Sequence, residues 1–392
     1  MNKITSLFTA LMLTLLLNAQ EKTATYTFTV IKENPITSVK NQFNTGTCWS
    51  FSGVGLLESE LLRTNKGEHD LSEMYIVRKN YEDKAIKYAR LHGNLNFGPG
   101  GSFADVVETI DDFGILPDSV YRGLHYGSES HNHSEMDKVL KGYMKSLVES
   151  NTLSTAWFEG FTKILDAYLG EVPETFVCNG KQYTPQSFAE SLGLKTSDYV
   201  SLTSFSHHPF YSKFPIEVPD NWRWADSYNL PLDDMIAVID NAIMNGYTVA
   251  WASDVSEPGF SRLGIAIVPD ENAPENAGSD QAKWLELSSR EKSSSLREKI
   301  GGEILKEKTI TQEMRQEAFD NFQTTDDHGM QIYGIANDQN GNKYYMVKNS
   351  WGITGPYNGI WYASESFVRY KTTNIVVNKN ALPAVIAKKM GL

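Results

Sequence analysis

The sequence predicts an α+β fold, with helices in the first part of the chain and antiparallel strands in the last part. Apolar residues recur at helical spacing directly after Cys48 and again across 136–169. Apolar and polar residues alternate from His328 onward, and a polar turn at 340–342 separates two such runs. We therefore expect a helical part followed by a β part that contains a hairpin.

The bulk properties describe an ordinary globular protein. The chain has 392 residues, of which 41% are hydrophobic and 21% are charged. This length fits two or three domain-sized units, or one enzyme core with a large insertion. The formal net charge of −12 argues against nucleic acid or an anionic membrane as the main partner.

Residues 1–20 have the pattern of a secretory signal peptide. Lys3 precedes an apolar run at 7–17, and a small residue, Ala19, lies near the end of the segment. The run is too short to span a bilayer comfortably. We expect export to the periplasm or the extracellular space, with no stable membrane anchor.

The first part of the mature chain, 21–130, is predicted to be mainly helical after a short strand at 23–30. The helix that starts at Cys48 is expected to end near Arg63, because an Asn-Lys-Gly sequence follows it. A second helix start is expected at 70–73, and a glycine-rich loop at 98–102 is expected to open a third helix.

The rest of the chain is divided into a helical insertion at 131–212 and a β part at 213–392. Apolar residues at helical spacing predict the helices of the insertion. In the β part, a helix from Pro231 precedes a buried strand at 247–252. The segment at about 269–308 is first acidic and then charged and helix-prone, so we expect a surface excursion there.

Cys48 is the first candidate for chemistry, because small polar residues lead up to it and a helical pattern follows at once. A thiol at a helix start faces unpaired backbone N–H groups and the positive end of the helix dipole, which both favour the thiolate. The alternative is an ordinary buried cysteine beside aromatic residues. Cys178, the second of the two cysteines, lies in an unrelated turn region, so we expect no disulfide between them.

Four further residues complete a thiol-based hydrolytic site. His328 heads a strand and Asn349 ends the returning strand, so the two can face each other across the hairpin. His328 can take the Cys48 proton while Asn349 orients its ring, and this neutral orienter suits a resting thiolate–imidazolium pair. Gln42 can share an oxyanion pocket with the Cys48 backbone N–H. Trp351 can shield the histidine–asparagine hydrogen bond from water.

This set resembles the papain-like cysteine peptidases, and in particular the bleomycin hydrolase/aminopeptidase C branch. The order Gln, Cys, His, Asn-Ser-Trp-Gly carries the family resemblance. The branch resemblance rests on Lys40-Asn41-Gln42, Thr47-Cys48-Trp49, 71–75, Gly100-Gly101-Ser102, and 168–176 with Tyr183-Thr184-Pro185. It implies a papain-like fold and a peptide or protein substrate. It also implies a site with nucleophile Cys48, general base and acid His328, orienter Asn349, oxyanion donor Gln42, substrate-backbone contacts Gly100 and Gly101, and supporting Trp49 and Trp351.

Two features depart from that branch, whose members are usually intracellular and carry a C-terminal arm that reaches the active-site cleft. Here an export signal is present, and the end at 387–392 is expected to be too short for such an arm. Exopeptidase and endopeptidase action therefore both stay open. A homo-oligomer is possible but is not supported by the short C-terminus, and nucleic-acid binding is not carried over.

Other functions and sites receive little support from the sequence. A non-catalytic peptide-binding relative would need a broken catalytic set, whereas amide hydrolysis of non-peptide substrates would use the same triad. The pairs His131/His133 and His207/His208 lack further ligands nearby in the sequence, so we expect loop histidines, no metal and no cofactor.

Overall fold

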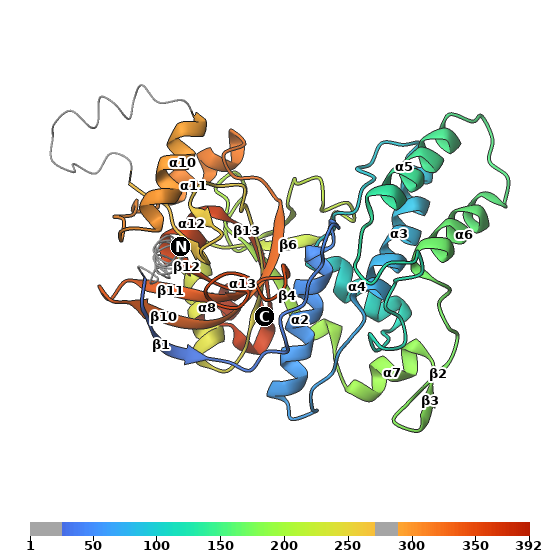
Figure 1. The fold of residues 1–392 in the computed structure, drawn as a ribbon, viewed down its shortest axis with the longest axis horizontal. Coiled ribbons are helices and arrows are strands. Elements are labelled where there is room, and N and C mark those ends of the chain that lie inside the picture. The colour runs from blue at the N-terminus through green and yellow to red at the C-terminus, as the bar shows by residue number, and fades with distance from the viewer. Residues whose placement is uncertain (1–25, 271–288) are drawn as a thin grey trace, which may run out of the picture.

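Residues 26–270 and 289–392 are described in the computed structural model of the chain, which has a helical half beside a β half (Figure 1). A small hairpin lies within the helical half. The helices there are α2 (Cys48–Arg63), α3 (Glu73–Arg90), α4 (Phe103–Phe113), α5 (Ser134–Val148), α6 (Trp157–Leu169) and α7 (Pro185–Leu192), and the hairpin pairs β2 (Phe176–Cys178) with β3 (Lys181–Tyr183).

One large sheet organises the β half. Its strands run in the order β5-β6-β4-β13-β7-β10-β11-β12-β9-β8, and β1 pairs with β10 beside this path. Most neighbours are antiparallel, whereas β4–β6 and β9–β12 are parallel. The strands are β1 (Phe28–Glu33), β4 (Tyr199–Thr203), β5 (Lys213–Pro215), β6 (Asp226–Asn229), β7 (Val249–Ser253), β8 (Phe260–Ser261), β9 (Ile265–Ala266), β10 (His328–Asp338), β11 (Lys343–Lys348), β12 (Ile360–Ser364) and β13 (Thr372–Asn378).

Several helices accompany this sheet. The longest apolar one, α8, packs against β7 and β10 and contributes to the main core of the β half. The helical elements of this half are η1 (Thr196–Asp198), α8 (Leu232–Met244), α10 (Ser289–Ile300), α11 (Gln312–Asp320), α12 (Glu365–Lys371), η2 (Lys379–Ala381) and α13 (Ala384–Met390).

The helix α2 lies between the two halves and joins their cores. One side of it packs on β10 and β7, and the other side packs on α3 and α4. Leu56 contacts the sheet with Ala250 and Val376, while Leu57 and Leu61 belong to the core of the helical half. Because layers cover it on both sides, α2 is buried along most of its length.

Several local predictions hold in the structure. The helix after the first cysteine spans Cys48–Arg63 as expected. Ser72 caps α3 by accepting from the Tyr75 backbone N–H, and Gly114 ends α4 with φ of 78°. The predicted hairpin is formed by β10 and β11, which pair antiparallel.

The division of the chain differs from the prediction at one point. Strand β4 falls within the range 131–212, which we assigned to a helical insertion, yet it pairs with β13 in the large sheet. A strand of five residues carries a weak pattern, and its pairing partner lies far along the chain. The β half therefore begins near residue 199, and β1 from the first part of the chain also joins it.

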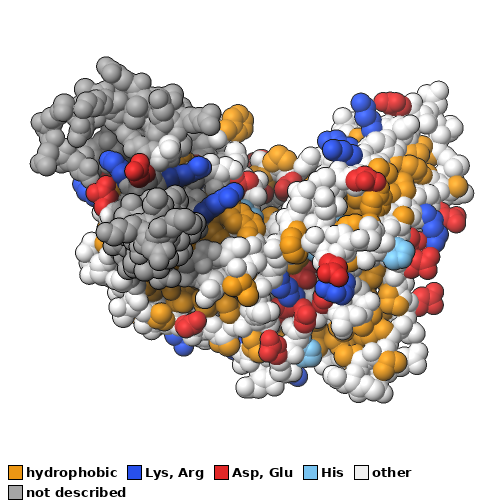
Figure 2. All heavy atoms as spheres, viewed as in Figure 1, with side chains coloured by type: hydrophobic (Ala, Val, Ile, Leu, Met, Phe, Trp, Pro, Cys, Tyr) orange, Lys and Arg blue, Asp and Glu red, His pale blue; other side chains and the backbone are white. Residues whose placement is uncertain are grey.

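Two predicted segments lie outside the described residues. These are the signal peptide at 1–20 and much of the surface excursion at 269–308, of which 271–288 is not described. Among the described helices, none is long and apolar enough to cross a membrane. The surface of the molecule is hollowed between the β half and the tip of the helical half near α5 (Figure 2).

Candidate active site

Cys48 is the first residue of α2, at the boundary between the two halves. The backbone N–H groups of Trp49 and Gly329 lie near its sulfur and favour the thiolate. The Ser52 hydroxyl donates to the Cys48 carbonyl over 2.7 Å, which fastens the first turn. The thiol is therefore held at a helix N-terminus, and it is a free thiol.

His328 and Asn349 face each other as the hairpin predicts. The distance from His328 Nε2 to Asn349 Oδ1 is 2.7 Å, and both side chains are buried. The same oxygen accepts from the Ser350 backbone N–H at 2.7 Å, so His328 is the donor in its bond. The Trp351 ring lies beside the imidazole, with 4.8 Å between ring centroids. These contacts fix the ring through Nε2, so Nδ1 is the nitrogen that can accept a proton.

A cavity of about 390 Å³ brings Cys48 and His328 together on one wall. Gly329 explains how the strand can approach the helix so closely. A Cβ atom at Gly329 would lie 2.7 Å from Ser52 Oγ and 3.3 Å from the Cys48 carbonyl carbon. Only a residue without a side chain allows β10 to pass α2 at this distance.

Burial opposes a charge on either member of this pair when the other is neutral. Burial raises the pKa of Cys48 to about 12, and nearby Asp326 and Asp220 add to this effect. Burial lowers the pKa of His328 to about 4, although its bond to Asn349 opposes the change. A single charge on either group is therefore disfavoured in the cavity, whereas proton transfer from Cys48 to His328 creates both charges together.

Gln42 lies in the loop before Cys48, and both ends of its side-chain amide have hydrogen-bond partners. It is buried, and its Nε2 donates to the Thr45 carbonyl over 2.8 Å, while the Ser350 hydroxyl donates to its Oε1 over 2.6 Å. Gln42 is not among the residues that line the cavity. The side chain supports the loop before Cys48, and its amide keeps a second N–H.

Gly100 and Gly101 line the cavity together with Trp49. The Trp49 indole N–H donates to the Pro99 carbonyl over 3.0 Å. A Cβ at Gly101 would lie 2.8 Å from this indole, and a Cβ at Gly100 would lie 2.0 Å from a carboxylate oxygen of Asp220. Close packing therefore requires both glycines, in addition to any contact that they make with a substrate.

Asp220 and Asp326 also line the cavity, although the sequence did not predict them as site residues. Burial raises the pKa of Asp326 to about 7, and the charge of Asp220 contributes. Burial likewise raises the pKa of Asp220, against the opposing charge of Lys84. Neither carboxylate forms an ion pair with a Lys or Arg of the described residues. The one feature of the sequence that could have indicated a place in the cavity is the position of Asp326, two residues before His328.

Two family profiles match the chain on either side of this cavity. Residues 26–138, which contain Cys48, match the papain family cysteine proteases, and residues 303–391, which contain His328, match the peptidase C1-like family. The chain is a papain-family cysteine peptidase. One matched segment of the peptidase therefore contributes Cys48 to the cavity, and the other contributes His328.

The peptidase is similar to several aminopeptidases along most of its length. It is 24% identical to aminopeptidase C of Streptococcus thermophilus over 391 residues, which cover 88% of this chain and 81% of the relative. It is 22% identical to aminopeptidase C of Lactococcus lactis subsp. cremoris, over 90% of this chain and 82% of the relative. The predicted family and its aminopeptidase C branch are thereby confirmed.

A solved structure supports the fold. PepW from Lactobacillus rhamnosis HN001 superposes on the peptidase with a TM-score of 0.70 and 19% identity, covering 99% of this chain and 92% of that structure. The predicted papain-like α+β fold is confirmed.

Proposed function

We propose that the peptidase cleaves peptide bonds with Cys48 as nucleophile, His328 as general base and acid, and Asn349 as the residue that orients the imidazole. The observation that carries this proposal is the shared cavity wall, where the thiol and the Asn349-held imidazole both face the same space. A nucleophile, a base and an orienter within one site are the parts that acyl transfer by a thiol requires.

The reaction proceeds in two stages. The Cys48 proton passes to His328 Nδ1 as the sulfur attacks the substrate carbonyl, and a C–S bond forms. His328 then gives the proton to the leaving amine, the C–N bond breaks, and an acyl-enzyme remains. Water attacks this thioester while His328 takes its proton, and the proton returns to the sulfur as the acid leaves.

The negative oxygen of each tetrahedral intermediate needs donors near Cys48. The Cys48 backbone N–H is one donor, and we assign Gln42 as the second through the N–H that it does not give to Thr45. The bond from the Ser350 hydroxyl to Gln42 Oε1 fixes the orientation of this amide.

The substrate class that we propose is a peptide with a free N-terminus. Asp220 and Asp326 place two carboxylates in the cavity without a Lys or Arg partner among the described residues, and an ammonium group would neutralise them. The names of the relatives, aminopeptidase C, agree with this class.

The catalytic proposal is tested with Cys48→Ala and, as the matched control, Cys178→Ala. Hydrolysis of fluorogenic aminoacyl substrates should fall by about a thousandfold or more in the first variant. It should be unchanged in the second, because Cys178 lies in the β2–β3 hairpin away from the cavity. Full activity of Cys48→Ala would contradict the proposal.

The substrate class is tested with one peptide in two forms, with a free amino terminus and with an acetylated one. We expect cleavage of the free form only. Equal cleavage of both forms would instead establish endopeptidase action by the same residues.

We also propose that the peptidase is exported, because residues 1–20 have the signal-peptide pattern. Cell fractionation of the full-length chain and of a chain that lacks 2–20 should place the first outside the cytoplasm and the second inside it. Retention of both chains in the cytoplasm would contradict export.

A further inference from the structure

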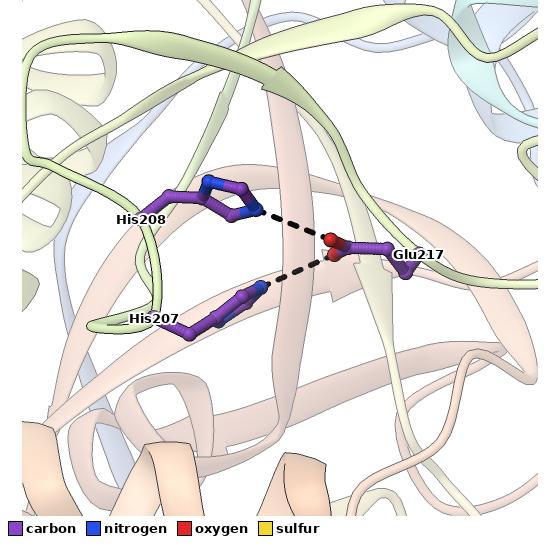
Figure 3. A group of neighbouring side chains, drawn as sticks. All are labelled: His207, His208 and Glu217. Atoms are coloured by element: carbon purple, nitrogen blue, oxygen red, sulfur yellow. Dashed lines mark hydrogen bonds and ion pairs between the residues drawn. The ribbon is translucent and has the colours of Figure 1, made fainter.

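Three side chains outside the catalytic cavity converge on one point. His207 and His208 lie in the loop after β4, and Glu217 lies just after β5 (Figure 3). The Nε2 atoms of His207 and His208 each lie 3.1 Å from a different oxygen of the Glu217 carboxylate. The candidate ligand atoms of the three residues lie within 4.8 Å of one another.

The spacing of these atoms is close to that of a metal centre. With bonds of about 2.0–2.1 Å, two ligands of a tetrahedral zinc ion are about 3.3 Å apart. Each imidazole lies 3.1 Å from its own oxygen of the Glu217 carboxylate, which is close to this separation, and all three ligand atoms lie within 4.8 Å of one another. Two imidazoles and one carboxylate are also a donor set that suits Zn²⁺ and leaves a position for water.

Neighbouring residues hold both imidazoles in place. The His208 ring stacks on Phe214 with 4.1 Å between centroids and an interplanar angle of 24°. The His207 ring lies nearly parallel to Phe319, and its Nδ1 lies 3.1 Å from Gln316 Nε2 and 3.3 Å from Gln316 Oε1. A polar partner on the second ring nitrogen is the usual support of a histidine ligand.

The Glu217 carboxylate has only histidines as ion-pair partners among the described residues. Among the described residues, it forms ion pairs with the two histidines but with no Lys or Arg. No lysine or arginine of the described residues therefore competes with a metal ion for this carboxylate.

We propose that His207, His208 and Glu217 form a binding site for a divalent transition-metal ion of the Zn²⁺ type. The site lies behind the wall of the catalytic cavity, because Ile216 and Val218, on either side of Glu217, line that cavity. The ion braces this wall and does not take part in the cleavage reaction. The sequence did not predict the site, because Glu217 follows the histidines only after the chain has returned through β5.

Zinc binding to the full chain is measured by titration calorimetry after dialysis against a chelator, with Zn²⁺ as the only added metal. The background is Cys48→Ala/Cys178→Ala, which removes both thiols as competing ligands. We expect one ion per chain, and binding about 100-fold weaker in His208→Ala and in Glu217→Gln. His69→Ala, at a half-buried histidine in another loop, is the matched control and should bind like the background.

Thermal unfolding separates loss of the site from loss of the fold. Zn²⁺ should raise the melting temperature of the background protein and of His69→Ala, but not that of His208→Ala or Glu217→Gln, whose melting without metal should be unchanged. Absence of zinc binding in the background protein would overturn the proposal, as would unchanged binding in both ligand variants. The proposal does not depend on the catalytic roles assigned above.

Discussion

At the scale of single residues, the cavity combines a half-buried thiol with two carboxylates that oppose its ionisation. Asp326 and Asp220 both raise the pKa of Cys48, after burial itself. In an enzyme that needs a thiolate, this negative potential would be unfavourable unless a cation neutralised it during catalysis. A substrate ammonium group would do so, and it would therefore activate the nucleophile as it binds.

Removal of the Asp326 charge should make the free thiol more acidic. In Asp326→Asn, we expect the pH profile of Cys48 alkylation by iodoacetamide to move to lower pH by about one unit. Cys178→Ala serves as the background, so that one thiol reports. Asp112→Asn, an exposed carboxylate on α4, is the control. An unchanged profile in Asp326→Asn would show that its charge does not reach the sulfur.

The same carboxylate should make substrate binding depend on pH. The pKa of Asp326 is raised to about 7, and a carboxylate attracts an ammonium group only when it is deprotonated. The KM for a peptide with a free amino terminus should therefore rise as the pH falls from about 8 to about 5.5. The KM of Asp326→Asn should be high throughout this range. Parallel KM profiles in the two proteins would exclude Asp326 from binding the amino terminus.

At the scale of elements, the site depends on the approach of β10 to α2. Gly329 permits this approach, and the hydrogen bonds of Asn349 then hold His328 at the end of the strand. The residues of this arrangement were predictable, because each lies at an element boundary with a clear pattern. The close approach itself was not, since a glycine inside a strand has several explanations.

Gly329→Ala should therefore reduce catalysis more than its small volume suggests. The added Cβ would meet Ser52 Oγ at 2.7 Å, so β10 must move away from the nucleophile. We expect a destabilisation of about 1–3 kcal/mol and a fall in kcat of about 100-fold. The control is Gly142→Ala on α5, where no atom lies within 4 Å and alanine should stabilise the helix by about 0.5–1 kcal/mol. Near-normal kcat in Gly329→Ala would contradict this account of the approach.

At the scale of the whole molecule, two halves with separate cores meet along α2 and enclose the cavity. The sequence predicted the fold class, the bounds of α2 and the β10–β11 hairpin, because these depend on local patterns and short turns. It did not predict that β4 joins the sheet, that Asp220 lines the same cavity as Cys48, or that Glu217 contacts His207. Each of these depends on contacts between segments far apart in the chain, which periodicity does not record.

Contacts between distant segments also affect the stability of the whole molecule. His133 is fully buried, neither ring nitrogen has a hydrogen-bond partner, and its backbone N–H donates to the Asn44 carbonyl in the segment before Cys48. Burial lowers the pKa of His133 to about 3. The folded state therefore favours the neutral form of His133, whereas the unfolded chain binds a proton at about pH 6.5. The folded state loses stability as the pH falls from about 6.5 towards 3.

His133→Leu should reduce this acid sensitivity. Between pH 6.5 and 5, the free energy of unfolding of the native chain should fall by up to about 2 kcal/mol more than that of the variant. Urea unfolding at the two pH values measures the difference. His125→Leu, at an exposed histidine, is the control and should behave like the native chain. Equal losses in the native chain and in His133→Leu would contradict the role of this histidine.

The most direct test of the central claim is the location of a covalent label. The peptidase is treated with a thiol-reactive peptidyl electrophile that has a free amino terminus, and the modified residue is identified by peptide mass spectrometry. We predict rapid modification of Cys48, none of Cys178, and a loss of the rapid phase in His328→Ala while the fold is retained. Modification of Cys178 instead, or rapid modification of Cys48 without His328, would contradict the account.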